Sequence, residues 1–130
     1  MSYKIAIVED EVSIQQMYKM KLEREGFAVA VAANGFEGLA VAERFKPDLI
    51  LLDLRMPGMG GDEMLARLRN TEWGGGIHVV ILTNISKNEA PQALRFLHVD
   101  RYIVKAQHTP SQVVLMAKEV LGIKPTPTVS

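Results

Sequence analysis

The chain has 130 residues, enough for one domain with a substantial core, and its 48% hydrophobic and 23% charged residues are typical of a soluble globular protein. Its 15 Lys and Arg residues balance its 15 Asp and Glu residues, so the overall charge favours neither nucleic acid nor a membrane surface as a partner. It contains no cysteine for disulfides or thiolate metal sites, and no apolar run of about 20 residues or signal-peptide pattern, so we expect a cytoplasmic location.

Short apolar runs rich in Val and Ile alternate with stretches whose apolar residues recur at helical spacing. Most of the runs are apolar at successive positions, which is typical of strands covered on both faces. In chain order the pattern predicts strand Lys4–Val8, helix Val12–Arg24, strand Phe27–Ala32, helix Phe36–Phe45, strand Asp48–Leu52, helix Asp62–Asn70, strand His78–Leu82, helix Lys87–Leu97, strand Arg101–Val104 and helix Ser111–Leu121.

Five successive β-α units predict an α/β fold, with one parallel sheet flanked by helices on both sides. We expect a doubly wound five-stranded sheet of order 2-1-3-4-5, a flavodoxin-like (βα)5 three-layer sandwich. The apolar side of the second helix is predicted to carry Phe36, Leu39 and Ala40. Residues 1–122 form the expected domain, and residues 123–130 form a Pro/Thr-rich tail or the start of a linker.

Polar residues follow four of the five predicted strands. Glu9 and Asp10 follow the first strand, and Asp53 follows the third. In a doubly wound sheet, ligands bind at the carboxyl ends of the strands, and neighbouring strands lie about 5 Å apart. We therefore expect three carboxylates to converge there, joined by the hydroxyl of Thr83 and, across a wider gap, by the long side chain of Lys105.

These pieces together resemble the receiver domain of two-component response regulators over about Tyr3 to Leu121. The resemblance is carried by the acidic pair Glu9-Asp10, the D-x-x-M-P-G-M-x-G run from Asp53 to Gly61, Thr83, and Y-x-x-K at Tyr102 and Lys105. Each piece alone is a weak signal, because acids often cap helices and Asp with Pro-Gly forms turns. Their occurrence in order, each at its strand end, is a strong one.

The resemblance implies that Asp53 is a phosphoacceptor that takes a phosphoryl group from a histidine kinase or a histidine phosphotransfer domain. It also implies a Mg²⁺ cofactor bound by Asp10, Asp53 and the backbone carbonyl of Arg55, with Glu9 acting mostly through water. Such a dication would offset the repulsion among the acids. Glu11 is expected in the first turn of the first helix.

In such a domain Lys105 pairs with the phosphoryl group, Thr83 hydrogen-bonds one of its oxygens, and Tyr102 moves inward behind Thr83. The output is a population shift of the face formed by helix 4, strand 5 and helix 5, through which a homodimer could also form. The domain would phosphorylate itself but turn over no metabolite, and would bind neither nucleic acid nor membrane. The residues expected on the output face are Lys87, Gln92, Arg95, Phe96, Tyr102, His108, Gln112 and Met116.

The sequence departs from the family pattern at several positions. Ala106 follows Lys105 where proline is usual, which predicts either a strained cis bond or a different loop. Asn84 stands where a small residue is common, and Arg55 lies two residues after Asp53, so both could modulate access to the phosphoacceptor. His98-Val99 replaces the Gly-Ala that often precedes the fifth strand.

Three other functions compete with this interpretation. An aspartyl phosphohydrolase would need an acid two residues after its nucleophile, where this chain has Arg55. A flavodoxin-like electron carrier would need a Ser/Thr/Gly-rich phosphate loop after the first strand, and the acids there would repel a phosphate. A degenerate receiver that acts as a phosphorylation-independent interaction module is the alternative that the departures leave open.

Overall fold

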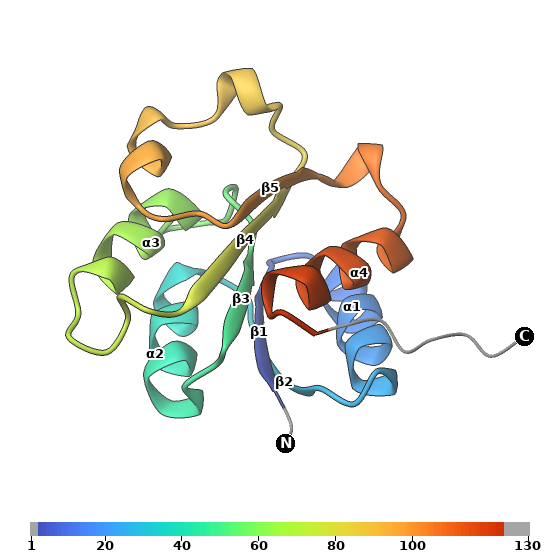
Figure 1. The fold of residues 1–130 in the computed structure, drawn as a ribbon. Helices are drawn as coiled ribbons and strands as arrows, with labels where there is room; N and C mark the ends of the chain where they lie inside the picture. The colour runs from blue at the N-terminus through green and yellow to red at the C-terminus, as the bar shows by residue number, and fades with distance from the viewer. Residues whose placement is uncertain (1–2, 124–130) are drawn as a thin grey trace, which may run out of the picture.

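A computed structural model describes residues 3–123. It contains one parallel sheet of order β2-β1-β3-β4-β5, as the β-α alternation predicts, and four α-helices in those residues (Figure 1). The elements are β1 (Lys4–Val8), α1 (Val12–Arg24), β2 (Ala28–Ala32), α2 (Gly35–Phe45), β3 (Leu49–Leu52), α3 (Gly61–Arg69), β4 (His78–Thr83), the 3₁₀ turns η1 (Lys87–Glu89) and η2 (Gln92–Phe96), β5 (Arg101–Val104), the 3₁₀ turn η3 (Lys105–Gln107) and α4 (Pro110–Val120).

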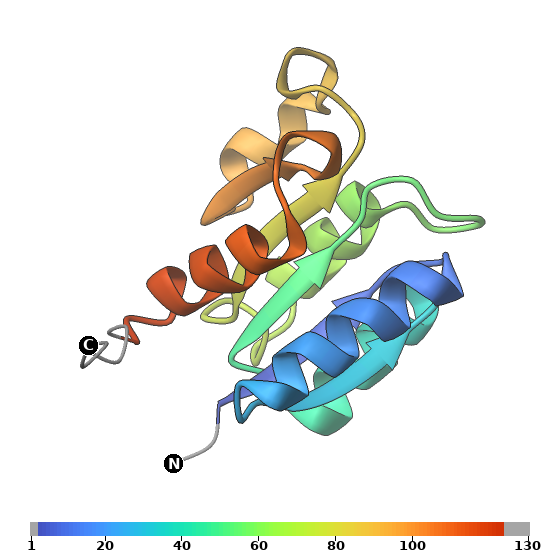
Figure 2. The same cartoon turned by 90° about the vertical axis from the view of Figure 1, so that its right-hand side faces the viewer.

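The sheet is the middle of three layers, with α1 and α4 on one face and α2 and α3 on the other (Figures 1 and 2). The central strand β3 reads LILL, and all four of its residues are buried, because both of its faces are covered. Two apolar clusters result. One joins the sheet to Met64, Leu65 and Leu68 of α3, and the other joins it to Leu22 of α1 and to the inner side of α4.

The predicted helix Lys87–Leu97 is absent, and that prediction was wrong. The segment forms the two short turns η1 and η2, separated at Ala90-Pro91. Proline lacks an amide hydrogen and disfavours helical backbone in the residue before it. Ala90 accordingly has extended φ and ψ of −65° and 144°. The expected helix 4 of the output face is therefore η1 and η2, and the expected helix 5 is α4.

The predicted apolar side of the second helix was wrong for Phe36 and Ala40, which are exposed, whereas Leu39 packs against the core. Phe36 of α2 is 59% exposed, whereas Gly35, Gly38 and Val41 are buried. Gly35 is pressed against Met59, where an added Cβ would lie 2.8 Å from both side-chain and backbone atoms. Because its glycines allow this close approach, α2 turns its small residues, rather than its aromatic one, toward the rest of the domain.

The last helix agrees with the sequence at both ends. Thr109 and Gln112 form a capping box at the start of α4, with Pro110 in its first turn. The chain leaves the helix at Gly122, whose positive φ of 73° favours glycine. The expected Pro/Thr tail falls almost wholly outside the described residues. None of the helices at residues 3–123 has the length and apolar character to span a bilayer.

Candidate functional site

The strand register brings the ends of β1 and β3 to the same edge of the sheet. Val8 pairs with Leu52, so the residues that follow them, Glu9 and Asp53, leave the sheet side by side. The amide of Asp53 continues the ladder by donating to the carbonyl of Val8 at 3.0 Å. The structure therefore brings these two predicted site residues together, and it buries both of them.

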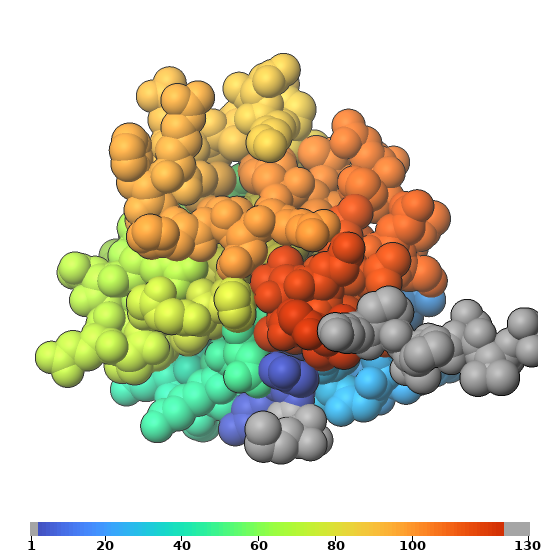
Figure 3. Space-filling model, viewed as in Figure 1, coloured from blue at the N-terminus to red at the C-terminus, as the bar shows by residue number. Residues whose placement is uncertain are grey.

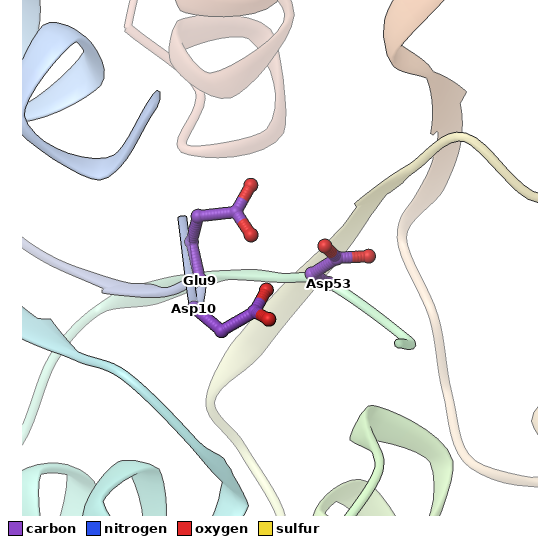
Figure 4. A group of neighbouring side chains, drawn as sticks. All are labelled: Glu9, Asp10 and Asp53. Atoms are coloured by element: carbon purple, nitrogen blue, oxygen red, sulfur yellow. The ribbon is translucent and has the colours of Figure 1, made fainter. Parts of the chain in front are cut away.

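The side chains of Glu9, Asp10 and Asp53 form one acidic cluster. Each offers a carboxylate oxygen, and these oxygens lie within 4.8 Å of one another. Figure 4 shows the carboxyl groups of Glu9 and Asp10 directed to the side on which Asp53 lies. Mg²⁺ prefers hard oxygen ligands at about 2.0–2.1 Å, so opposite ligands of an octahedral ion are roughly 4.2 Å apart. The donor set therefore suits Mg²⁺ in both chemistry and spacing.

Lys105 reaches this cluster from the edge strand. Its Nζ contacts Glu9 Oε1 and donates to Asp53 Oδ2 at 3.2 Å, after crossing the width of β4, which lies between β5 and β3. Burial opposes the positive charge, but the hydrogen bond to Glu9 and the charge of Asp53 outweigh it and raise the pKa of Lys105. The amine is therefore held as a cation beside the predicted phosphoacceptor.

Burial also disfavours the charged form of Glu9, and for this residue it is the largest influence on the pKa. It raises the pKa of the Glu9 carboxyl from 4.5 to about 7, and the neighbouring charge of Asp53 adds to this, while Lys105 opposes it. A carboxylate in these surroundings is unfavourable without more positive charge nearby. The cluster is thus suited to a dication, which would stabilise the ionised form of each acid.

Thr83 and Tyr102 both contact the loop that follows β4. Thr83 is buried, and its hydroxyl accepts a hydrogen bond from the amide of Ile85 at 3.4 Å. The hydroxyl of Tyr102 donates to the carbonyl of Ile85 at 2.7 Å. Burial and the charges of Asp53 and Glu89 raise the pKa of Tyr102. The two predicted switch residues are therefore joined through one loop residue.

The loop after β3 closes tightly around the backbone of Asp53. The amide of Arg55 donates to Asp53 Oδ1 at 3.4 Å, while the Arg55 side chain is exposed. Gly61 opens α3 so close to Asp53 that an added Cβ would lie 2.1 Å from the Asp53 carbonyl oxygen. The glycine-rich run after Asp53 is thus needed to bring the chain back over the end of β3.

A cavity of about 400 Å³ opens beside the acidic cluster. It includes both residues predicted to modulate access, Arg55 and Asn84. Glu11 and Glu89 also line it, and neither was predicted from the sequence to belong to the site. Glu11 precedes α1 instead of lying in its first turn. The lining residues are Asp10, Glu11, Asp53, Arg55, Thr83, Asn84, Ile85, Ser86, Glu89 and Lys105.

The loop after Lys105 begins with a short 3₁₀ turn. The chain enters the 3₁₀ turn η3 directly after β5, and residues 3–123 contain no cis peptide bond. Of the two outcomes expected from Ala106, the strained cis bond is therefore excluded in the described residues. His98 has a left-handed φ of 54°, so a non-glycine residue supplies positive φ near the position where the family often has glycine.

The family model of the response regulator receiver domain matches residues 5–117. Among curated proteins, the transcriptional regulatory protein ResD of Bacillus subtilis is 38% identical over 120 residues, which are 91% of this chain and 48% of ResD. The phosphate regulon transcriptional regulatory protein PhoB of Pseudomonas aeruginosa is 38% identical over 119 residues, covering 90% of this chain and 51% of PhoB. The chain spans about half the length of these two relatives.

Solved structures show the same fold. The chemotaxis response regulator CheY4 of Vibrio cholerae superposes with a TM-score of 0.84 at 28% identity, covering 92% of this chain and 99% of that one. A CheY-like receiver domain protein from Methanospirillum hungatei superposes with a TM-score of 0.85 at 30% identity, covering 94% of this chain and 95% of that one.

Proposed function

Because the chain belongs to the response regulator receiver domain family, we propose that Asp53 is its phosphoacceptor. Receiver domains are signalling domains rather than enzymes that turn over a metabolite. The observation that carries the proposal is the convergence of Glu9, Asp10, Asp53 and Lys105 at one end of the sheet. An Asp53 carboxylate oxygen bonds to phosphorus as the phosphorus–nitrogen bond of a phosphohistidine donor breaks, and the imidazole leaves.

We propose that Asp10, Asp53 and the backbone carbonyl of Arg55 hold Mg²⁺ directly, and that Glu9 acts through water. When bound, the ion neutralises charge on the phosphoryl oxygens, and phosphoryl transfer needs little beyond positioning and this neutralisation. Lys105 already lies 3.2 Å from Asp53 Oδ2 and would pair with the phosphoryl group there. Thr83 lines the same cavity and would donate its hydroxyl to a phosphoryl oxygen.

The structural effect of phosphorylation would be transmitted to the surface through the loop after β4. Thr83 and Tyr102 both bind Ile85, so drawing Thr83 toward Asp53 moves a residue that Tyr102 holds. The affected face consists of η1, η2, β5 and α4, and Figure 3 shows atoms of β5 lying between η2 and α4 on it. A groove of about 580 Å³ runs along η1, η2 and β5. We propose this face for a partner, an output domain or a second copy of the chain.

The relatives suggest the setting of this reaction. ResD and PhoB are transcriptional regulatory proteins, and a further relative, the sporulation initiation phosphotransferase F of Bacillus subtilis, is 37% identical over 83 residues, 64% of this chain and 65% of that protein. Receiver domains interact with histidine kinases and phosphotransfer proteins. We propose such a donor here, and the cytoplasmic location stays a prediction. The phosphorylation-independent module is not favoured, since the chain retains the residues that phosphorylation needs.

The site of phosphorylation can be tested by incubating the protein with acetyl phosphate and Mg²⁺. We expect a gain of one phosphoryl mass, and borohydride reduction followed by peptide mass spectrometry should place it on Asp53. Asp53→Asn should abolish the gain. Asp62→Asn, an acid nearby on α3, is the matched control and should leave it unchanged. An equal gain in Asp53→Asn would contradict the proposed function.

A further inference from the structure

Four polar or charged residues are buried within residues 3–123, and three of them, Glu9, Asp53 and Thr83, belong to the site. The fourth is Gln15 of α1, which is only 6% exposed and lies outside the carboxylate cluster. Burial of a side-chain amide is unfavourable unless its hydrogen bonds are made. The partners of Gln15 therefore indicate why a polar residue occupies the inner side of this helix.

Both of the hydrogen bonds that Gln15 Nε2 donates go to the main chain at strand ends. One reaches the carbonyl of Glu9 at 3.0 Å and the other the carbonyl of Ala32 at 3.1 Å. Gln15 Oε1 accepts from Gln16 Nε2 at 3.2 Å. Ala32 is the last residue of β2, and its carbonyl also accepts from the amide of Glu9 at 2.9 Å. A single side chain of α1 thus joins the ends of β1 and β2.

The carbonyl of Glu9 belongs to the rigid peptide plane that links Glu9 to Asp10. This plane lies between the end of β1 at Val8 and the start of α1 at Val12. Because the two acidic side chains leave the main chain on either side of the plane, its orientation sets where both carboxylates lie relative to Asp53. The hydrogen bond from Gln15 acts directly on that orientation.

We propose that Gln15 is a positioning residue for the metal site, whose amide fixes the Glu9–Asp10 peptide plane and so sets the spacing of the acids. The inference depends on the proposed function, which supplies the metal. Mg²⁺ demands nearly ideal octahedral geometry, whereas Ca²⁺ accepts more oxygen ligands in flexible arrangements. Loss of the Gln15 amide should therefore weaken Mg²⁺ binding more than Ca²⁺ binding, a change of selectivity that a general loss of stability would not produce.

The test compares Gln15→Met with Gln16→Met by calorimetric titration of each metal alone. Methionine has a similar length and flexibility, so it fills the space without the donors. Gln16 is the matched control, because it is exposed and its loss leaves both donors of Gln15 in place. We expect Gln15→Met to raise the Mg²⁺ Kd about tenfold and the Ca²⁺ Kd less than about threefold, in line with other residues that orient metal ligands. An unchanged Mg²⁺ Kd, or an equal weakening of both metals, would overturn the inference.

Hydrogen exchange of the unsubstituted, metal-free protein provides a second test that needs no variant to fold. The side-chain amide hydrogens of Gln15 should exchange at least about tenfold more slowly than those of Gln16, because Gln15 donates both of its amide hydrogens to buried carbonyls. Equal rates would overturn the inference, since Gln15 would then not hold the plane. Absence of Mg²⁺ binding by the unsubstituted protein would instead overturn the proposed function and, with it, the metal role of Gln15.

Discussion

Glu9 and Lys105 contact each other inside the site, where 5% and 14% of their side chains are exposed. Asp53 is nearly as buried and shares the same ammonium group. In a solvated cluster water would screen these charges, but here each ionised acid depends on the cations close to it. The chemistry of the site therefore comes from burial as much as from the choice of acidic residues.

The raised pKa of Glu9 predicts that Mg²⁺ binding at the proposed site depends on pH. Because this pKa is about 7 in the metal-free protein, a bound proton competes with Mg²⁺ below that pH. We expect the Mg²⁺ Kd to increase by up to about tenfold per pH unit as the pH falls from 7 toward 5, and to level off above 7. Calorimetric titrations across this range would measure it.

Glu9→Gln is the control, since it removes the titrating group while keeping its size. It should flatten the dependence between pH 5 and 7, and an unchanged slope would show that another group is responsible. In the metal-free protein the folded state binds more protons at Glu9 than the unfolded state does between pH 4.5 and about 7. The contribution of Glu9 to the free energy of unfolding should therefore decrease as the pH rises through this window.

Single residues differed in how far their place could be predicted. Glu9 and Asp53 follow apolar runs directly, so the strand pattern placed each at a strand end, and the expected strand order, which makes β1 and β3 neighbours, brought the two together. Glu89 had no such signal, because its place beside the cavity depends on where η1 ends. Gln15, by contrast, did carry a signal in the sequence. It precedes the buried Tyr18 and Leu22 by three and seven residues, so it is a polar residue on the apolar side of a helix.

Among the elements, the segment between β4 and β5 departs most from the sequence prediction. Leu94 and Leu97 have helical spacing, yet Pro91 stops a helix before its second turn can form. Much of the segment is exposed, and Leu94 is its buried apolar anchor. A segment with so few buried contacts has low local stability, which suits the part of the domain that is proposed to respond to phosphorylation.

Arg69, at the end of α3, binds the end of this segment that precedes β5. Its guanidinium donates to the carbonyls of Leu97 and His98, each at 2.8 Å, just before β5. It also donates to the carbonyls of Gly74 and Ile77 in the loop before β4. The planar fork of arginine can satisfy several carbonyls at once. One side chain therefore ties two loops to α3.

We expect Arg69→Met to lower the free energy of unfolding by about 2–3 kcal/mol, because several carbonyls lose a charged donor. Arg67→Met is the matched control. Arg67 lies on the same helix, but it forms an exposed ion pair with Glu63, and its loss should change the free energy by less than about 1 kcal/mol. Urea unfolding of both variants would measure the difference, and equal losses would refute the role given to Arg69.

At the scale of the whole molecule, the fold explains why the site exists. A parallel sheet directs every strand end to one edge, and the order β2-β1-β3-β4-β5 makes β1 and β3 neighbours there. The alternation of apolar runs and helical spacing was enough to predict this architecture, because both patterns reflect burial, even though η1 and η2 replace the fourth predicted helix. The buried side of α2 was harder to predict, since hydrophobicity pointed to Phe36 while the fit of Gly35 against Met59 decided the packing.

We propose above all that carboxylates following two adjoining strands bind the Mg²⁺ that allows Asp53 to accept a phosphoryl group. This proposal is tested most directly by the rate of Asp53 phosphorylation from acetyl phosphate as a function of Mg²⁺ concentration, measured by intact mass. We predict a rate that rises with Mg²⁺ to saturation, and a requirement in Asp10→Asn for at least about tenfold more Mg²⁺. Phosphorylation of Asp53 at the same rate in EDTA as in Mg²⁺ would contradict the account.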